Sequence, residues 1–125
     1  MTLGFIGTGN MGLPMAEKLV DAGQTLIAYD ARPDALEPLR ERQVRVAKSV
    51  RDIADSADTV FVSLPTLDAL RSVCIGADGV VQGSAVKTLV NTCTVGVPLV
   101  EVIAGVAAEK GITVIDCPIS GGPPG

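Results

Sequence analysis

Three glycines near the N-terminus constrain the fold more than any other feature of the chain. They are Gly7, Gly9 and Gly12; an apolar run over residues 3–6 precedes them, and apolar residues at helical spacing follow from Met11. The first glycine allows a tight turn, the second lets the backbone approach a ligand, and the third lets a helix pack closely on the strand. This G-x-G-x-x-G spacing between strand and helix is typical of a turn that holds the pyrophosphate of a dinucleotide.

Composition excludes several classes of site. The 125 residues are enough for one domain with a real core, and they include no histidine. Catalysis by Ser-His-Asp or Cys-His groups and histidine-containing metal sites are therefore excluded within this chain. Cys74, Cys93 and Cys117 are odd in number and widely spaced. We expect no disulfide framework and no metal site, and we expect these thiols to be buried as small apolar groups.

Charge and hydropathy restrict the partners. The net charge is −4, the basic residues are scattered, and aromatic residues make up 2% of the chain, so no nucleic-acid surface is expected. Although 47% of the residues are hydrophobic, no apolar run approaches the length of a membrane span. Met1 leads directly into the first predicted strand and leaves no room for a signal peptide. These features predict a cytoplasmic protein without a membrane partner.

The remaining pattern alternates strands with helices. Strands are predicted at residues 3–6, 25–29, 44–47, 58–64, 89–90 and 112–115, and helices at 11–22, 33–42, 49–54, 67–75 and 98–110. Pro38 is expected to kink or shorten the second helix, Ser49 and Asp52 to form a capping box, and Thr66 to cap the fourth helix. The alternation predicts one α/β domain over residues 1–125. Its Rossmann-type, doubly wound parallel sheet has the order 3-2-1-4-5-6, with helices on both faces.

Polar and glycine residues collect where the predicted strands end. Ligands of such sheets bind outside the carboxyl ends of the strands. The residues at those ends are Gly7 to Gly12, Asp30, Ser63-Leu64-Pro65, Asn91 to Thr94 and Asp116 to Gly122. This distribution predicts a nucleotide-binding site along one edge of the sheet.

Two residues after the second strand bear on the choice of cofactor. Asp30 lies 23 residues after Gly7, near the spacing at which a carboxylate accepts hydrogen bonds from the ribose hydroxyls of NAD and repels a 2′-phosphate. An aspartate that only caps the following turn is the alternative. Arg32 could pair with a 2′-phosphate, so NAD is favoured while NADP stays possible.

The segment after the sixth strand is the second unusual feature. Ser120 offers a hydroxyl, and Gly121 and Gly122 offer backbone amides that no side chain obstructs. Such a nest suits the carboxylate or hydroxyl of a small acid. A flexible glycine linker is the alternative interpretation.

Two motifs, one at each end of the chain, resemble those of the β-hydroxyacid dehydrogenase family and have the separation found there. The segment Gly4 to Gly12, with Met11 before its last glycine, looks like the start of that family, and Asp116 to Gly122 resembles its D-x-P-V-S-G-G substrate motif. Cys117 and Ile119 are mild variants of the second motif, and the resemblance covers essentially the whole chain.

The resemblance implies hydride transfer between a nicotinamide cofactor, NAD or NADP, and a small 3-hydroxy acid. Ser120, Gly121 and Gly122 would hold the substrate. Thr94 would lie near the nicotinamide, where Cys93 replaces the usual serine. The implied cofactor-binding residues are Gly7, Thr8, Gly9, Asn10, Met11, Gly12, Asp30, Arg32, Ser63, Leu64, Pro65 and Thr94.

The resemblance also implies that the catalytic residue lies outside this sequence. The family's general acid/base is a lysine in a G-x-x-G-x-G-x-x-x-K segment, which would follow Gly125, together with a helical domain through which the family forms homo-oligomers. The four lysines here, Lys18, Lys48, Lys87 and Lys110, do not match that segment and are expected to be solvated. The chain resembles a cofactor domain cut from a longer enzyme, or a naturally shortened relative, that binds dinucleotide without turnover.

Two functions of other classes are left open by the residues alone. One is a non-catalytic domain that senses NAD(P), which would need no Ser120. The other is a methyltransferase that uses S-adenosylmethionine, since that class also places an acidic residue after a glycine turn. Its glycine pattern usually lacks the third glycine, and it has no use for a Ser-Gly-Gly segment.

Overall fold

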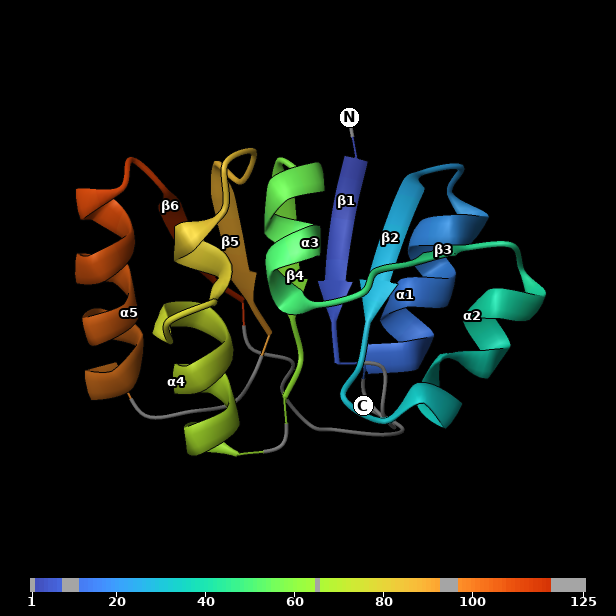
Figure 1. Ribbon diagram of the computed structural model, residues 1–125, viewed down its shortest axis with the longest axis horizontal. Coiled ribbons are helices and arrows are strands. Elements are labelled where there is room, and N and C mark those ends of the chain that lie inside the picture. The colour runs from blue at the N-terminus through green and yellow to red at the C-terminus, as the bar shows by residue number, and fades with distance from the viewer. Residues whose placement is uncertain (1, 8–11, 65, 93–96, 118–125) are drawn as a thin grey trace.

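Six parallel strands form one sheet in the order β3-β2-β1-β4-β5-β6 (Figure 1). The computed structural model describes residues 2–7, 12–64, 66–92 and 97–117. The strands are β1 (Thr2–Ile6), β2 (Thr25–Tyr29), β3 (Arg45–Val46), β4 (Thr59–Val62), β5 (Thr88–Asn91) and β6 (Thr113–Asp116). The predicted fold class and strand order are confirmed, and the strand boundaries differ from the predicted ones by at most two residues, with β2 as predicted.

Helices cover both faces of this sheet. They are α1 (Gly12–Asp21), the 3₁₀ turn η1 (Pro33–Leu36), α2 (Glu37–Glu41), α3 (Val50–Ser56), α4 (Leu67–Ile75), the 3₁₀ turn η2 (Val80–Gln82) and α5 (Val97–Glu109). The strand order reverses direction after β3, so right-handed connections place α1 and α2 on one face and α4 and α5 on the other. None of the described helices is long and apolar enough to cross a membrane.

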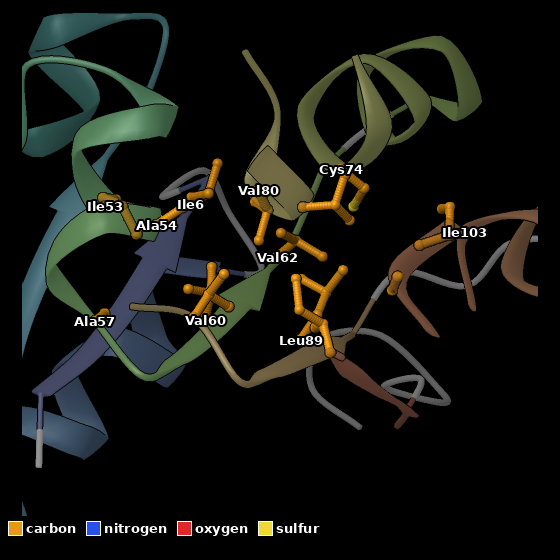
Figure 2. Close-up of a cluster of buried hydrophobic side chains, with 14 of the residues drawn as sticks. Ile6, Ile53, Ala54, Ala57, Val60, Val62, Cys74, Val80, Leu89 and Ile103 are labelled. Carbon is orange, nitrogen blue, oxygen red and sulfur yellow. The ribbon is translucent and has the colours of Figure 1, made fainter. Parts of the chain in front are cut away.

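Each face has its own buried core. The larger core lies between the sheet and α3, α4 and α5; Figure 2 shows Val60 and Val62 of β4 in this core, with Leu89, Cys74 and Val80 around them. The smaller core lies under α1 and α2, where the rings of Phe5 and Phe61 stack with centroids 5.9 Å apart. Strands buried on both faces explain the nearly continuous apolar runs of the sequence.

The predicted helix caps are present, with one correction. The Thr66 hydroxyl accepts from the Ala69 amide at 3.0 Å, and the Ser49 hydroxyl accepts from the Asp52 amide at 3.0 Å. The Asp52 carboxylate does not close a capping box on Ser49. It accepts instead from the amide of Lys48, one residue earlier, at 3.0 Å.

The segment expected to form one helix over residues 33–42 is divided in two. Pro33 opens η1, and Pro38 lies in the first turn of α2. A proline amide nitrogen has no hydrogen to donate, and the first turn of a helix is where this loss costs least. Pro38 therefore helps to start a second, short helix and does not kink a continuous one.

The Asp55 carboxylate joins α3 to the segment that leads into β5. It accepts from the Ser84 amide at 2.8 Å, from the Ser84 hydroxyl at 3.1 Å and from Nε of Arg51 at 3.2 Å. The hydrogen bond from the Ser84 amide, with smaller effects of Arg51 and the Ser84 hydroxyl, holds the pKa of Asp55 below its ordinary value of 3.8.

We predict that Asp55→Ala lowers the melting temperature at pH 7. Because the folded-state pKa is depressed, this stabilisation is complete above pH 3.8 and is lost as the pH falls through the folded pKa. The difference in melting temperature between the variant and the unsubstituted protein should therefore shrink in acid. Thermal unfolding followed by circular dichroism from pH 7 to pH 3 measures it, with the exposed Glu101→Ala in α5 as control. A difference that does not depend on pH would contradict the assignment.

Candidate functional site

The last residues of five strands form one row across the sheet. Tyr29 of β2 pairs with Ile6 of β1, Ile6 with Val62 of β4, Val62 with Asn91 of β5, and Asn91 with Asp116 of β6. We call this set the carboxyl-edge row; it follows the ends of the strand arrows in Figure 1. In all five strands the chain therefore leaves the sheet at the same level.

The residues that follow the strands are held by this row. Four of them donate a backbone amide hydrogen to a carbonyl of the row: Gly7 to Tyr29 (2.9 Å), Ser63 to Ile6 (2.9 Å), Thr92 to Val62 (3.1 Å) and Cys117 to Asn91 (2.8 Å). Three of the four predicted cofactor segments thus begin beside one another, at Gly7, Asp30 and Ser63, although they are far apart in the sequence. The register of the sheet produces this neighbourhood.

Gly7 and Gly12 lie where side chains have no space. Gly7 has a φ of +94°, and a Cβ built on it would lie 2.0 Å from the Ser63 carbonyl oxygen. A Cβ on Gly12 would lie 2.0 Å from the Gly7 carbonyl oxygen and 3.1 Å from the Phe5 ring. The first turn of α1 therefore rests directly on the end of β1, which is the role predicted for the third glycine.

The N-terminus of α1 has the character expected of an anion site. Its first turn carries no acidic residue, and its third residue, Pro14, has no amide hydrogen of its own to leave unpaired. The unpaired amides and the positive end of the helix dipole point toward the carboxyl edge. The Gly7 amide donates to the Tyr29 carbonyl and is therefore not available to a phosphate.

Asp30 and Arg32 lie at the end of β2, next to Gly7. The Asp30 carboxylate accepts from the backbone amide of Arg32 at 2.9 Å, which is the turn-capping role that the sequence left as an alternative. An ionised carboxylate has about four acceptor positions, so this hydrogen bond is compatible with a second role toward ribose hydroxyls. The Arg32 side chain is exposed at the same corner of the sheet.

Ser63 and Leu64, predicted as the last residues of the fourth strand, lie just after β4. The Leu64 side chain would lie 3.2 Å from a Cβ on Gly7, so the segment after β4 forms one wall beside the glycine turn. The other predicted site residues lie outside the described part of the chain, and their roles stay predictions: Thr8, Gly9, Asn10, Met11, Pro65, Thr94, Ser120, Gly121 and Gly122.

Three polar residues at this edge received no individual role from the sequence. Asn91 and Thr92 are buried, with exposures of 4% and 7%. Nδ2 of Asn91 donates to Oδ1 of Asp116 at 2.9 Å, and the Thr92 hydroxyl donates to the Val62 carbonyl at 2.7 Å. The available signal was a polar residue at the end of an apolar strand, but the pairing itself depends on the register.

The cysteines and lysines do not add a second site. Cys74 is buried in the larger core as expected, whereas Cys117 is exposed just after β6, so the expectation that every thiol is buried was wrong. Cys93 lies outside the described residues. In the part of the chain that the structure describes, no three His, Cys, Asp or Glu side chains come close enough to hold a metal ion. The four lysines are exposed, as predicted.

Comparison with known proteins agrees with this geometry. Residues 2–125 match the model of a protein family described as the NAD binding domain of 6-phosphogluconate dehydrogenase. The chain is 36% identical over 121 residues to 3-hydroxyisobutyrate dehydrogenase of Pseudomonas aeruginosa. It is 34% identical over 122 residues to a probable mitochondrial 3-hydroxyisobutyrate dehydrogenase of Dictyostelium discoideum.

A solved structure shows the same arrangement. The 3-hydroxyisobutyrate dehydrogenase of Mycobacterium tuberculosis, whose structure was determined with L-serine, superposes with a TM-score of 0.87 at 30% identity. That match covers 97% of this chain and 41% of the solved one. The two matches to sequences cover 96% and 97% of this chain but only 41% and 38% of the relatives. The chain therefore spans about two fifths of the proteins that it resembles.

We predict that Gly12→Ala and Gly7→Ala both destabilise the protein. In each variant the new Cβ meets a backbone carbonyl, and overpacking of this kind costs about 1–3 kcal/mol. Gly7→Ala also adds about 1–2 kcal/mol for a positive φ, so it should be the more severe of the two. Denaturant unfolding measures the free energy of unfolding for each variant.

Two other glycines separate the cost of overpacking from the cost of a positive φ. Gly105, inside α5, has open space around it, so Gly105→Ala should stabilise the protein by about 0.5–1 kcal/mol. Gly23 has a φ of +84° and open space, so Gly23→Ala should show only the conformational cost. If Gly12→Ala were as harmless as Gly105→Ala, the close contact between α1 and β1 would be wrong.

Proposed function

The chain belongs to the family of NAD-binding domains of the 6-phosphogluconate dehydrogenase type, and we propose that its protein is an NAD-dependent dehydrogenase of small 3-hydroxy acids. The observation that carries the proposal is the meeting of Gly7, Asp30 and Ser63 beside the carboxyl-edge row, with the N-terminus of α1 above them. The names of the relatives support the hydroxy acid as the substrate class.

The described residues fit a dinucleotide. The close approach of α1 and the Ser63 segment to the end of β1 is possible only because neither Gly7 nor Gly12 has a Cβ, and the N-terminus of α1 held there would receive the pyrophosphate. Asp30 would bind the adenosine ribose, and Arg32 would flank it. Ser63 and Leu64, with Pro65 and Thr94, would line the nicotinamide half. The bound nicotinamide supplies or accepts the hydride.

We propose NAD as the preferred cofactor. The Asp30 carboxylate lies at the end of β2, where it would accept hydrogen bonds from ribose hydroxyls and repel a 2′-phosphate. Arg32 attracts such a phosphate, but its backbone amide is the group that contacts the Asp30 carboxylate. This hydrogen bond therefore holds the Asp30 carboxylate at the end of β2 without involving the Arg32 guanidinium.

Asp30→Ala is predicted to raise the Kd for NADH by about tenfold or more, because hydrogen bonds to a charged acceptor contribute about 1.5–3 kcal/mol. The Kd for NADPH should change less or fall, so discrimination between the two cofactors decreases. Fluorescence titration with both cofactors measures this, with Asp34→Ala in η1 as a control acid on the same connection. An unchanged ratio of the two Kd values would contradict the role of Asp30.

The substrate half of the proposal depends on residues that follow β6. The Ser120 hydroxyl and the Gly121 and Gly122 amides would bind the hydroxy acid, and a lysine beyond Gly125 would move its hydroxyl proton. We expect residues 1–125 expressed alone to bind NADH and to turn over 3-hydroxyisobutyrate and L-serine negligibly. Initial rates of NADH formation, compared with the whole encoded protein, measure this. A robust rate from residues 1–125 alone would show that the lysine is not needed.

One titration separates the proposed function from its alternatives. NADH, NADPH and S-adenosylmethionine are titrated into the whole protein, and oxidation of hydroxy acids is assayed in parallel. Binding of NADH with turnover supports the dehydrogenase. Binding of NADH without turnover of any small 3-hydroxy acid favours a sensing domain, and binding of S-adenosylmethionine alone overturns the proposal.

A further inference from the structure

Asn91 joins the ends of β5 and β6 in two ways. Its carbonyl accepts from the Cys117 amide at 2.8 Å, and its side-chain Nδ2 donates to the Asp116 carboxylate at 2.9 Å. The backbone contact belongs to any parallel ladder, but the side-chain contact is specific to this pair of residues. It lies on the final register pair of the two strands, where the chain leaves the sheet.

Thr92 makes a comparable connection on the other side of β5. Its hydroxyl donates to the Val62 carbonyl at 2.7 Å, and its amide donates to the same oxygen at 3.1 Å. Both hydrogen bonds are buried with the residue, which is 7% exposed. Side-chain hydrogen bonds therefore connect β4 to β5 and β5 to β6 at the carboxyl edge.

Core packing alone does not explain an amide at this position. Ile6 and Val62, which occupy the same row on β1 and β4, are apolar and buried. Burying the polar side chain of Asn91 at 4% exposure has a desolvation cost that an apolar residue would avoid. A hydrogen bond is directional, whereas apolar contact is not. The Asn91 amide therefore fixes the position of the end of β6 relative to the end of β5.

The two joined strand ends lead to the two segments on which the proposed reaction depends. Thr94, predicted beside the nicotinamide, follows Asn91 by three residues. Ser120, predicted to hold the substrate, follows Asp116 by four residues. A displacement of one strand end relative to the other would therefore change the distance between substrate and nicotinamide.

We infer that Asn91 and Asp116 are positioning residues that set the substrate segment against the nicotinamide segment. The inference rests on the proposed function and goes beyond it, because it makes this pair a determinant of the affinity for the hydroxy acid. Most of the proposed dinucleotide residues follow β1, β2 and β4, and only Thr94 follows β5, so the pair should affect NADH binding less than it affects acid binding.

The test is a double-mutant cycle in the whole encoded protein with Asn91→Ala, Asp116→Ala and the double variant. L-serine and 3-hydroxyisobutyrate are titrated by calorimetry in the presence of saturating NADH, and NADH alone is titrated separately. Each single variant should weaken binding of the acids by about three- to tenfold, as expected for the loss of one hydrogen bond. The loss in the double variant should be smaller than the sum of the two single losses, because both single variants remove the hydrogen bond between Asn91 and Asp116.

Three further measurements distinguish positioning from general stability. Asp116→Asn keeps an acceptor oxygen of similar shape and should restore part of the acid affinity that Asp116→Ala loses. Thr113→Ala, at the other end of β6, should leave acid binding unchanged. Hydrogen exchange of the Cys117 amide should accelerate in Asn91→Ala while exchange of the Gly7 amide does not. Because Asp116 is exposed, Asp116→Ala removes the same hydrogen bond even if Asn91→Ala lowers the melting temperature.

The possible outcomes separate this inference from the proposed function. If the unsubstituted protein binds neither NADH nor the acids, the proposed function fails, and the inference fails with it. If it binds both and Asn91→Ala and Asp116→Ala change neither, only the positioning role is wrong. Additive losses in the double variant, or equal losses of NADH and acid binding, would also overturn the positioning role.

Discussion

The contact of the first turn of α1 with the end of β1 is the constraint on which the rest of this structure depends. A side chain on Gly12 would come within 2.0 Å of the Gly7 carbonyl oxygen, and one on Gly7 would come within 2.0 Å of the Ser63 carbonyl oxygen. Two adjacent connections thus approach backbone to backbone. Because β1 is central in the sheet, this contact also places the helix N-terminus above the ends of both neighbouring strands.

The parallel register turns that local contact into a site. Five strands end on one row, so segments that are distant in sequence leave the sheet side by side. The row is apolar at Ile6 and Val62, over the larger core, and polar at Asn91 and Asp116. Most of the predicted dinucleotide residues follow the apolar half, where packing of β1, β2 and β4 sets the strand ends, and Thr94 follows β5. The substrate residues are predicted to follow the polar half, where side-chain hydrogen bonds set the strand ends.

Much of this could be predicted because the determining features are local. The glycine spacing, the apolar strands and the cap residues act within a few positions of themselves, and they gave the fold, the strand order and the places of Gly7, Gly12, Asp30 and Ser63. One local competition was not resolved by the pattern: Asp52 binds the Lys48 amide instead of that of Ser49. Pro38 was expected to kink or shorten the second helix, and α2 spans only Glu37–Glu41, with Pro38 in its first turn. Cys117 was expected to be buried and is exposed because it follows the outermost strand of the sheet.

By itself, the sequence determined that polar residues would collect at the carboxyl edge of a doubly wound sheet and that glycines would hold α1 against β1. Those outcomes follow from backbone sterics and from the handedness of strand connections, which any chain with this pattern obeys. Only the tertiary structure decided that Asn91 meets Asp116 and that Thr92 meets the Val62 carbonyl. Which polar groups face each other depends on strand register, and register is set by the packing of two cores on opposite faces of the sheet.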